Sequence, residues 1–192
     1  LRQIKQLNKP ENMLEIWDEK LSEYAEIICK YRIEFIKKLN NKIKKIHSEV
    51  TEDKEKLEIN YITECENKEN YLALLKQRRK LDIIKGFTTK GIHRDDFKCL
   101  INDKEIEIYG SQGQHRTAIL SLKLAELYVI YDEIGEYPIL LLDDFMSELD
   151  EKRRKSFLSY IKDTQVIITC TDKMELENIK LFNVTNGKIV DN

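Results

Sequence analysis

Two adjacent acidic residues follow a run of four aliphatic residues in the second half of the chain. The run is Ile139-Leu140-Leu141-Leu142, and the acids are Asp143 and Asp144. A buried strand that ends in carboxylates places them at the carboxyl edge of a sheet, where α/β proteins bind ligands. One carboxylate at such an edge can hold Mg²⁺, and the next can polarise the water that attacks a phosphate. Taken alone, the pattern also fits any strand that enters a turn.

A second candidate site lies upstream, in the segment Gly110-Ser111-Gln112-Gly113-Gln114. This segment opens a predicted helix that runs from Gly113 to about Ile134, and the free N–H groups of a helix start favour an anion. When the segment stands alone, an ordinary serine cap beside a flexible glycine is the favoured explanation. The order of the motifs favours a nucleotide site, because the paired acids are followed by Ser147-Glu148-Leu149-Asp150.

These motifs together resemble the RecF family of ATP-binding-cassette (ABC) ATPases, which act in DNA repair. Residues 110–114 resemble the ABC signature loop, residues 139–144 resemble a Walker B element, and residues 147–150 resemble a D-loop. The longer stretch 110–130 and the segment Gly91-Ile92-His93-Arg94-Asp95-Asp96 resemble RecF in particular. The resemblance runs from about Trp17 to Val190, and other SMC-like ATPases such as RecN share pieces of it.

The resemblance assigns roles to individual residues. In this class two ATPase heads enclose two ATP molecules, so the signature loop of one subunit completes the ATP site of the other. Asp143 would help to hold Mg²⁺, and Asp144 would be the catalytic carboxylate. The residues that would bind ATP across the dimer, or shape the loop that does so, are Ser111, Gln112, Gly113, Gln114 and Asp150.

Three departures from the family pattern predict weak hydrolysis. The phosphate-cradling segment G-x-x-x-x-G-K-[ST] does not occur, and the resemblance places it in an upstream lobe. We therefore expect the chain to be part of something larger and to hydrolyse no ATP alone. Asp144 stands where many ABC proteins carry Glu. Thr171, a second catalytic candidate, stands at the switch position where His is common, and its hydroxyl cannot hold a proton as imidazole does.

The patterns around the motifs predict an α/β fold in two parts. Residues 1–86 form a coiled-coil-like helical arm with a short strand near 57–63, and residues 87–192 form the C-terminal lobe of an ABC-type ATPase head. Strands with continuous apolar runs, separated by helices, predict a largely parallel sheet buried on both faces. One apolar seam follows the first helix and must pack on a partner: Leu14, Trp17, Leu21, Tyr24, Ile28, Tyr31, Phe35, Leu39, Ile43, Ile46 and Val50.

Smaller elements complete the predicted fold. A second helix runs from about Asn67 to Lys85, with Leu72, Leu75, Leu81 and Ile84 inward and Gly86 as its stop. Short strands are expected at 87–89, 97–101, 105–108, 139–142 and 166–169, and a helix near 151–160. Asn102-Asp103 and Asn186-Gly187 are typical of tight hairpin turns.

Composition excludes several classes of protein. The 192 residues contain no apolar run near the ~20 that cross a bilayer, so we expect a cytoplasmic protein. The four cysteines lie far apart without a C-x-x-C pair, which excludes a zinc-finger spacing and favours reduced, mostly buried thiols. Charge is uneven: residues 1–90 hold 20 basic and 16 acidic side chains, whereas residues 91–192 hold 13 and 19.

The basic front half favours contact with DNA. The candidate residues are Lys37, Lys38, Lys44, Lys45, Arg78 and Arg79. If they share a face, they could hold backbone phosphates without sequence preference. An ordinary solvated helix face explains the same residues, so both interpretations stay open.

His93-Arg94-Asp95-Asp96 resembles the catalytic loop of a protein kinase, but the rest of that pattern is missing. Leu100 stands where the Asn is expected, and no D-F-G follows. A structural ion-pair role is favoured for this segment, with a role in nucleotide or DNA binding as the alternative.

The resemblance implies a recombination mediator of DNA repair and the SOS response. Such a protein would dimerise on DNA with ATP, recognise gaps or junctions of single and double strands, and help to load RecA together with RecO and RecR. Two alternatives are a structural coiled-coil ATPase of the SMC or RecN kind and an inert scaffold. A transporter subunit is disfavoured by the long helical arm.

Overall fold

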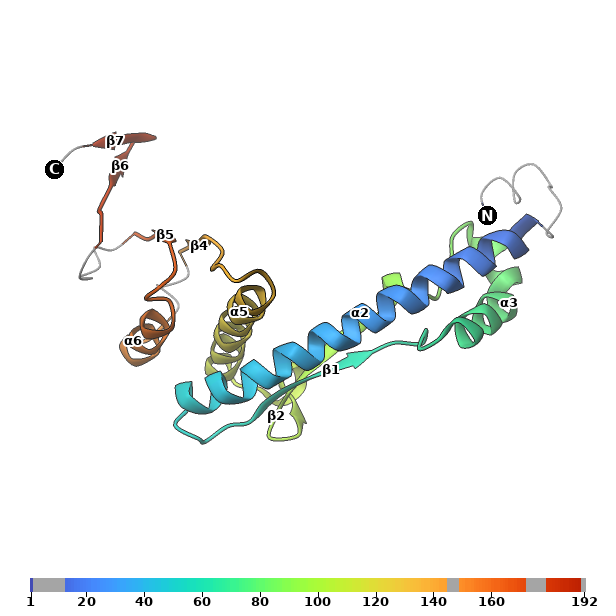
Figure 1. Cartoon of the computed structure of the whole chain (residues 1–192), viewed down its shortest axis with the longest axis horizontal. Helices are drawn as coiled ribbons and strands as arrows, with labels where there is room; N and C mark the ends of the chain where they lie inside the picture. Colours follow the sequence, from blue (N-terminus) through green and yellow to red (C-terminus); the bar gives the residue numbers. More distant parts are fainter. Residues whose placement is uncertain (2–12, 145–148, 172–178, 191–192) are drawn as a thin grey trace.

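The computed structural model describes residues 1, 13–144, 149–171 and 179–190. The fold is mixed α/β, as predicted, and is built on one long helix, α2 (Met13–Val50). Helix α3 (Lys68–Lys85) packs on the N-terminal half of α2, and α5 (Gln112–Ile134) packs near its C-terminal end (Figure 1). Helix α2 therefore belongs both to the predicted arm and to the compact part of the fold around α5, β1 and β4.

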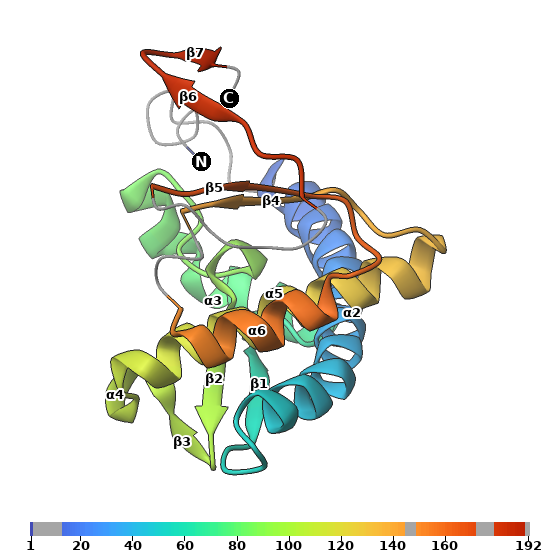
Figure 2. The same cartoon turned by 90° about the vertical axis from the view of Figure 1, so that its left-hand side faces the viewer.

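Three small sheets complete the fold. The strands β1 (Leu57–Ile62), β2 (Asp96–Ile101) and β3 (Lys104–Glu105) are antiparallel, in that order. The strands β4 (Leu140–Asp143) and β5 (Val166–Thr169) are parallel, and α6 (Glu151–Tyr160) connects them. Helices α5 and α6 lie on one side of this pair (Figure 2). The hairpin of β6 (Asn183–Thr185) and β7 (Lys188–Val190) stands apart. The short helices are η1 (Ile92–Arg94) and α4 (Ile106–Tyr109).

The main hydrophobic core forms where α2 meets α5 and β1. Ile43 of α2, Leu57 of β1 and Leu120 of α5 are almost completely buried there. Phe157 of α6 packs in the same core. Because every element around the candidate site contributes to this core, their relative positions are fixed by packing rather than by loops.

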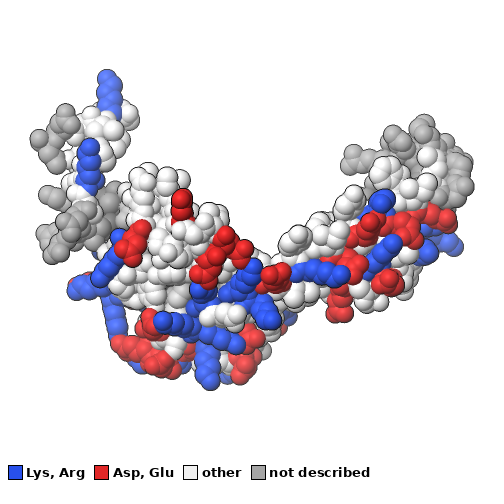
Figure 3. Space-filling view, viewed as in Figure 1, with Lys and Arg blue, Asp and Glu red and all other residues white. Residues whose placement is uncertain are grey.

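The apolar seam of α2 is buried at Leu14 and over its second half, but not between these. Trp17 is 64% exposed and Tyr31 70%, and Leu21, Tyr24, Ile28 and Phe35 are exposed as well. The residues that α2 buries in this stretch are Asp18, Ser22, Ala25 and Cys29. The predicted seam is therefore wrong for this half, because short side chains bring α3 close while the large ones face outward. Figure 3 shows a mainly uncharged upper edge on this part of the arm.

Two predicted strands are wrong. Residues 87–89 form an irregular turn, because buried Asp82 accepts hydrogen bonds from Thr89 N (3.1 Å) and Thr89 Oγ1 (2.5 Å). Asp82 takes the inward position on α3, and Ile84, which was expected inside, is 67% exposed. Residues 105–108 leave the sheet after Glu105 and turn into α4, where Ile106 is buried.

The hairpin turns and the helix stop are confirmed. Asn102, Asp103, Asn186 and Gly187 all have positive φ, as type I′ turns require. Gly86 has φ 78° and ends α3 in the left-handed region. These features are encoded by adjacent residues, which explains why sequence alone located them.

The parallel pair β4–β5 is buried on one side only in the part of the chain that the structure describes. Leu142 is 9% exposed, whereas Leu141 and Ile167 are 70% and 55% exposed. The expected burial on both faces is therefore not found here. Cys29 and Cys65 are buried as expected, but Cys170 is exposed, and all four thiols are free. None of the described helices is both long and apolar enough to cross a membrane.

The Asn40 side chain of α2 hydrogen-bonds the backbone of β1. The Asn40 amide donates to Ile59 O and accepts from Ile59 N, each at 2.8 Å. Ile59 is 2% exposed, so water cannot replace either bond.

Asn40→Ala should lower the free energy of unfolding by about 1–3 kcal/mol, because it leaves a buried N–H and C=O without partners. Urea unfolding of the purified protein measures this, with exposed Asn41→Ala as the matched control. Equal losses in both variants would contradict the role of Asn40.

His47 of α2 is completely buried where this helix packs on α5. Its Nδ1 lies 2.9 Å from Ser121 Oγ, and its Nε2 lies 3.4 Å from Glu55 Oε2. Burial lowers the pKa of His47, and the nearby Glu55 carboxylate opposes that shift. The folded protein therefore binds a proton here less readily than the unfolded chain does.

Acidification should destabilise the fold through His47. The contribution is fully present above the unfolded pKa, near 6.5, and is lost as pH falls below it, with a slope on the order of 1 kcal/mol per pH unit. Urea unfolding at pH 7.5 and pH 5.5 measures the loss. The His47→Gln variant should lose less stability over this range, and an unchanged pH dependence would contradict the assignment.

Candidate functional site

Ser111 caps α5 and closes a reciprocal pair of hydrogen bonds with Gln114. The Ser111 hydroxyl accepts from Gln114 N at 3.2 Å, and Gln114 Oε1 accepts from Ser111 N at 2.9 Å. This capping box fixes the loop on the helix that follows it. Ser111 and Gln112 are exposed, so the loop faces solvent at the positive end of the α5 dipole.

Packing requires glycine at one of the two glycine positions of this loop but not at the other. A Cβ atom on Gly110 would lie 2.4 Å from Ile106 O, so packing against α4 requires glycine there. A Cβ atom on Gly113 would meet only Arg153 Nη2 at 3.7 Å and Ser111 Oγ at 3.9 Å, which are ordinary contacts. Glycine in a helix costs up to about 1 kcal/mol relative to alanine. Nothing inside the described chain requires Gly113, and its effect is to leave the helix start open to close approach.

The paired acids lie at the carboxyl edge of β4, as predicted. Asp143 is paired with Thr169 of β5, and the Thr169 hydroxyl donates to Asp143 Oδ1 at 2.5 Å. Asp144 N donates to Thr169 O at 3.2 Å, and Asp144 has φ 47°, in the left-handed region. This turn ends the strand and leaves both carboxylates exposed. Thr171 is exposed two residues beyond the end of β5, at the same edge.

Asp150 caps α6 and pairs with Arg153, whose guanidinium lies beside Gly113 of the signature-like loop (residues 110–114). Its carboxylate accepts from Arg153 N at 2.8 Å and forms an ion pair with the Arg153 guanidinium. The Arg153 backbone N–H, and then the guanidinium charge, lower the pKa of Asp150. Because Arg153 also borders Gly113, the residues predicted to act across a dimer lie near one another. Ser147 and Glu148, predicted as part of the D-loop, lie outside the described residues.

The edge of β4 fits Mg²⁺ only together with phosphate oxygens. Within the described ranges, no group of three His, Cys, Asp or Glu side chains could hold a metal ion. Mg²⁺ in nucleotide sites commonly takes one or two carboxylates and completes its shell with phosphates and water. Asp143 is one exposed carboxylate at this edge, and its role in holding Mg²⁺ stays a prediction.

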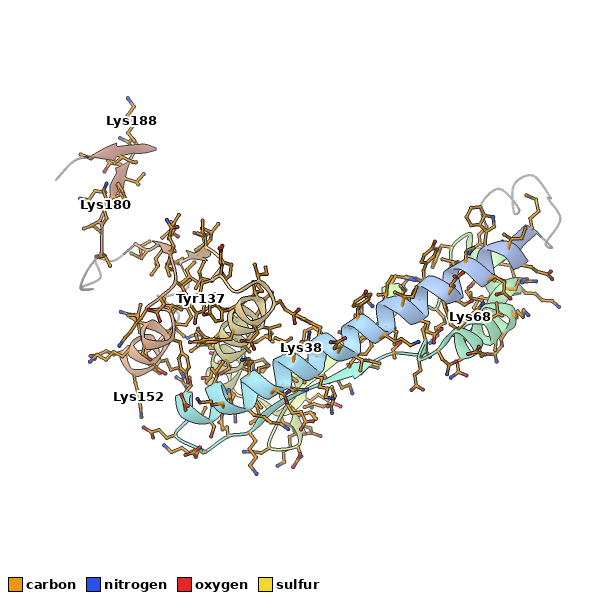
Figure 4. All side chains as sticks on the ribbon, in the orientation of Figure 1. Lys38, Lys68, Tyr137, Lys152, Lys180 and Lys188 are labelled. Atoms are coloured by element: carbon orange, nitrogen blue, oxygen red, sulfur yellow. The ribbon has the colours of Figure 1, made fainter. Side chains whose placement is uncertain are left out.

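The basic candidates do not form one surface. Lys37 and Lys44 are exposed, lie seven residues apart on one face of α2, and make no ion pair with a described residue. Lys38, labelled in Figure 4, pairs with Glu133 of α5 where the two helices meet. Lys45 lies 4.0 Å from Glu49.

Arg78 and Arg79 lie apart from those lysines, on α3 at the other end of α2. Arg79 points inward and pairs with Asp18 at 2.6 Å, with 17% of its side chain exposed. Acidic side chains also alternate with basic ones over the face seen in Figure 3.

The His93–Asp96 segment has the structural role that was favoured, carried by Asp95. The Asp95 carboxylate is 3% exposed and pairs with Arg32 at 3.2 Å. It also accepts hydrogen bonds from the Thr63 hydroxyl at 2.9 Å and from the Tyr61 hydroxyl. Burial, and then the bond to Asp95, raises the pKa of Tyr61 to about 12.

Glu55 is a site residue that no sequence pattern indicated. Its Oε1 accepts from Gln114 Nε2 at 2.9 Å, so it contacts the signature-like loop directly. Fifty-nine positions separate the two residues, and no local pattern marks such a pair.

Comparison with known proteins identifies the family. No protein-family model matches the chain. The proteins called DNA replication and repair protein RecF from Clostridium perfringens (strain SM101) and Clostridium tetani are both 45% identical to it. These matches cover 97% and 94% of this chain, and 54% and 53% of the relatives. A solved structure described as the recombination mediator protein RecF with ATP, in the RecFOR pathway, matches with a TM-score of 0.85 and 41% identity. That match covers 98% of this chain and 52% of the other.

The chain thus spans about half the length of the relatives that it matches. Sequence identity and fold agree over nearly all of its own residues. Over that shared half, the chain belongs to the RecF family.

Proposed function

We propose that this chain supplies the signature-like loop and the acidic edge of a RecF-type recombination mediator. In that protein, ATP and Mg²⁺ drive two copies together on DNA at gaps or junctions of single and double strands. RecO and RecR are the proposed partners, and RecA loading is the proposed outcome. The chain alone is expected to hydrolyse no ATP, because it carries no phosphate-cradling G-x-x-x-x-G-K-[ST] segment.

The open helix start at Gly113 carries this proposal. Packing within the described chain does not require this glycine, and the lack of a side chain leaves the start of α5 open to close approach. A γ-phosphate held by another subunit is an anion of the right kind for this position. The Ser111 hydroxyl would donate to it, and the α5 dipole would favour its charge.

Asp143 and Asp144, the acidic edge at the end of β4, would support hydrolysis of the nucleotide bound to the same subunit. Asp143, oriented by the Thr169 hydroxyl, would hold Mg²⁺. Asp144 would accept the proton of the attacking water. Thr171 lies at this edge and can donate a hydrogen bond, but it cannot store a proton, so we expect slow turnover.

Lys37, Lys44, Lys45 and Arg78 are the residues that we retain for DNA contact. The three lysines are exposed on α2 and Arg78 lies on α3, whereas Lys38 pairs with Glu133 and Arg79 with Asp18. Contacts of this kind bind backbone phosphates without sequence preference and weaken steeply with salt.

Light scattering tests the proposal most directly, on a protein that combines this chain with the other half of its RecF relatives. A shift from monomer to dimer on addition of Mg·ATP is expected. A constant mass with ATP bound would instead favour the alternatives, an inert scaffold or a structural coiled-coil ATPase.

Gly113→Ala should weaken ATP-driven dimerisation at least about tenfold while leaving the fold intact. The added methyl group fits within the chain and favours the helix by up to about 1 kcal/mol, but it obstructs an approaching phosphate. Light scattering over a range of protein concentrations measures the dimer, and nucleotide content is the control. Unchanged dimerisation would mean that no ligand approaches this helix start.

Asp144→Asn should slow ATP hydrolysis by roughly tenfold to 100-fold, because the amide cannot accept the proton of the attacking water. The ATP-bound dimer should persist or last longer, since shape and metal binding are retained. Phosphate release and light scattering measure the two properties. Loss of the dimer would count against the catalytic role of Asp144.

A further inference from the structure

A line of polar contacts joins the C-terminal end of α2 to the signature-like loop. Gln114 Nε2 donates to Glu55 Oε1 at 2.9 Å. The second oxygen of Glu55 lies 3.4 Å from His47 Nε2, and His47 Nδ1 lies 2.9 Å from Ser121 Oγ. The line runs from Gln114 of α5 through Glu55, which precedes β1, and His47 of α2, and it returns to α5 at Ser121.

Burial makes this line sensitive to its geometry. The side chain of His47 is completely buried, and that of Glu55 is 22% exposed. Ser121 is also completely buried, and its hydroxyl donates to Thr117 O at 3.0 Å. Polar groups with little access to water cannot exchange a lost partner for solvent, so each contact restrains the next.

Glu55 selects the orientation of the Gln114 amide. A glutamine amide has a donor end and an acceptor end, and rotation by half a turn exchanges them. A carboxylate can only accept, so it draws the NH₂ end of Gln114 toward Glu55. The acceptor end then points to Ser111 N, which is the bond that closes the capping box.

His47 restrains Glu55 from the other side. The Nε2–Oε2 contact is within ion-pair range, but His47 Nε2 makes no well-aligned hydrogen bond. It therefore restrains Glu55 through close contact rather than through a directed bond. The turn that carries Glu55 is held as well, because Thr51 Oγ1 donates to His47 O at 2.7 Å and Lys152 of α6 pairs with Glu52.

We propose that Glu55 is a positioning residue for the signature-like loop. By fixing the Gln114 amide, it holds Ser111 and the start of α5 in the arrangement that receives a phosphate from a second subunit. This inference rests on the proposed function for its consequence in dimerisation. Its structural part, the ordering of the loop by Glu55, stands independently.

The test compares Glu55→Ala, Glu55→Gln and the control Glu58→Ala. Glu58 is exposed and lies three residues further along the chain, and Glu58→Ala removes the same charge as Glu55→Ala. The protein combines this chain with the other half of its RecF relatives. Amide hydrogen exchange over residues 111–118 reports the loop, light scattering with Mg·ATP reports the dimer, and ATP affinity of the monomer reports the fold.

Glu55→Ala should speed exchange over residues 111–118 and weaken the ATP dimer, each about tenfold, with ATP affinity of the monomer unchanged. Glu55→Gln should recover most of both effects, because its amide oxygen still accepts from Gln114. Glu58→Ala should resemble the parent. Parent-like exchange in Glu55→Ala, or equal losses in Glu55→Ala and Glu55→Gln, would overturn the proposal.

A double-mutant cycle with Gln114→Met keeps the proposal testable if Glu55→Ala folds poorly. Methionine has similar length but no amide, so Gln114→Met should itself speed exchange over the loop. Glu55→Ala should then cause no further change in the Gln114→Met background, and additive effects would overturn the inference. Where Glu55→Ala folds poorly, parent-like exchange in Gln114→Met alone would overturn it. A parent protein that stays monomeric with Mg·ATP would refute the proposed function, and the exchange data would still decide the role of Glu55.

Discussion

The packing of α2 on α5 positions the whole candidate site. Ile43 and Leu120 are completely buried in this contact, and His47 bonds to Ser121 within it. Helix α5 carries the Ser111 loop at its start, and the chain then leads through Gly135 into β4 and its acidic end. A helix of 23 residues is a rigid rod, so a change in the α2–α5 contact would displace both ends.

Charged residues on α2 contribute to this same contact. Lys38 pairs with Glu133 of α5, and Lys42 pairs with Asp132 at 2.6 Å. Exposed ion pairs of this kind add little free energy, but they favour one arrangement of the two helices over others. The basic stretch of the sequence therefore divides between helix docking and the exposed lysines retained for DNA, which composition could not separate.

Apolar surface is left uncovered on both the arm and the compact part. Trp17 and Tyr31 on α2, and Leu141 and Ile167 on the parallel strands, are all more than half exposed. Contiguous apolar surface is typical of interfaces rather than of free surfaces. The chain covers about half the length of the RecF relatives that it matches.

The sequence by itself determined the features that neighbouring residues encode. The bounds of α5 and α6, the stop at Gly86, the hairpin turns and the acids at the end of β4 all depend on residues close in the chain. Only the tertiary structure decided which side chains meet across long separations. It placed Asp82 rather than Ile84 inside, turned Arg79 toward Asp18, and brought Glu55 to Gln114. Periodicity records which face is apolar, but the identity of a buried polar partner depends on distances that exist only after folding.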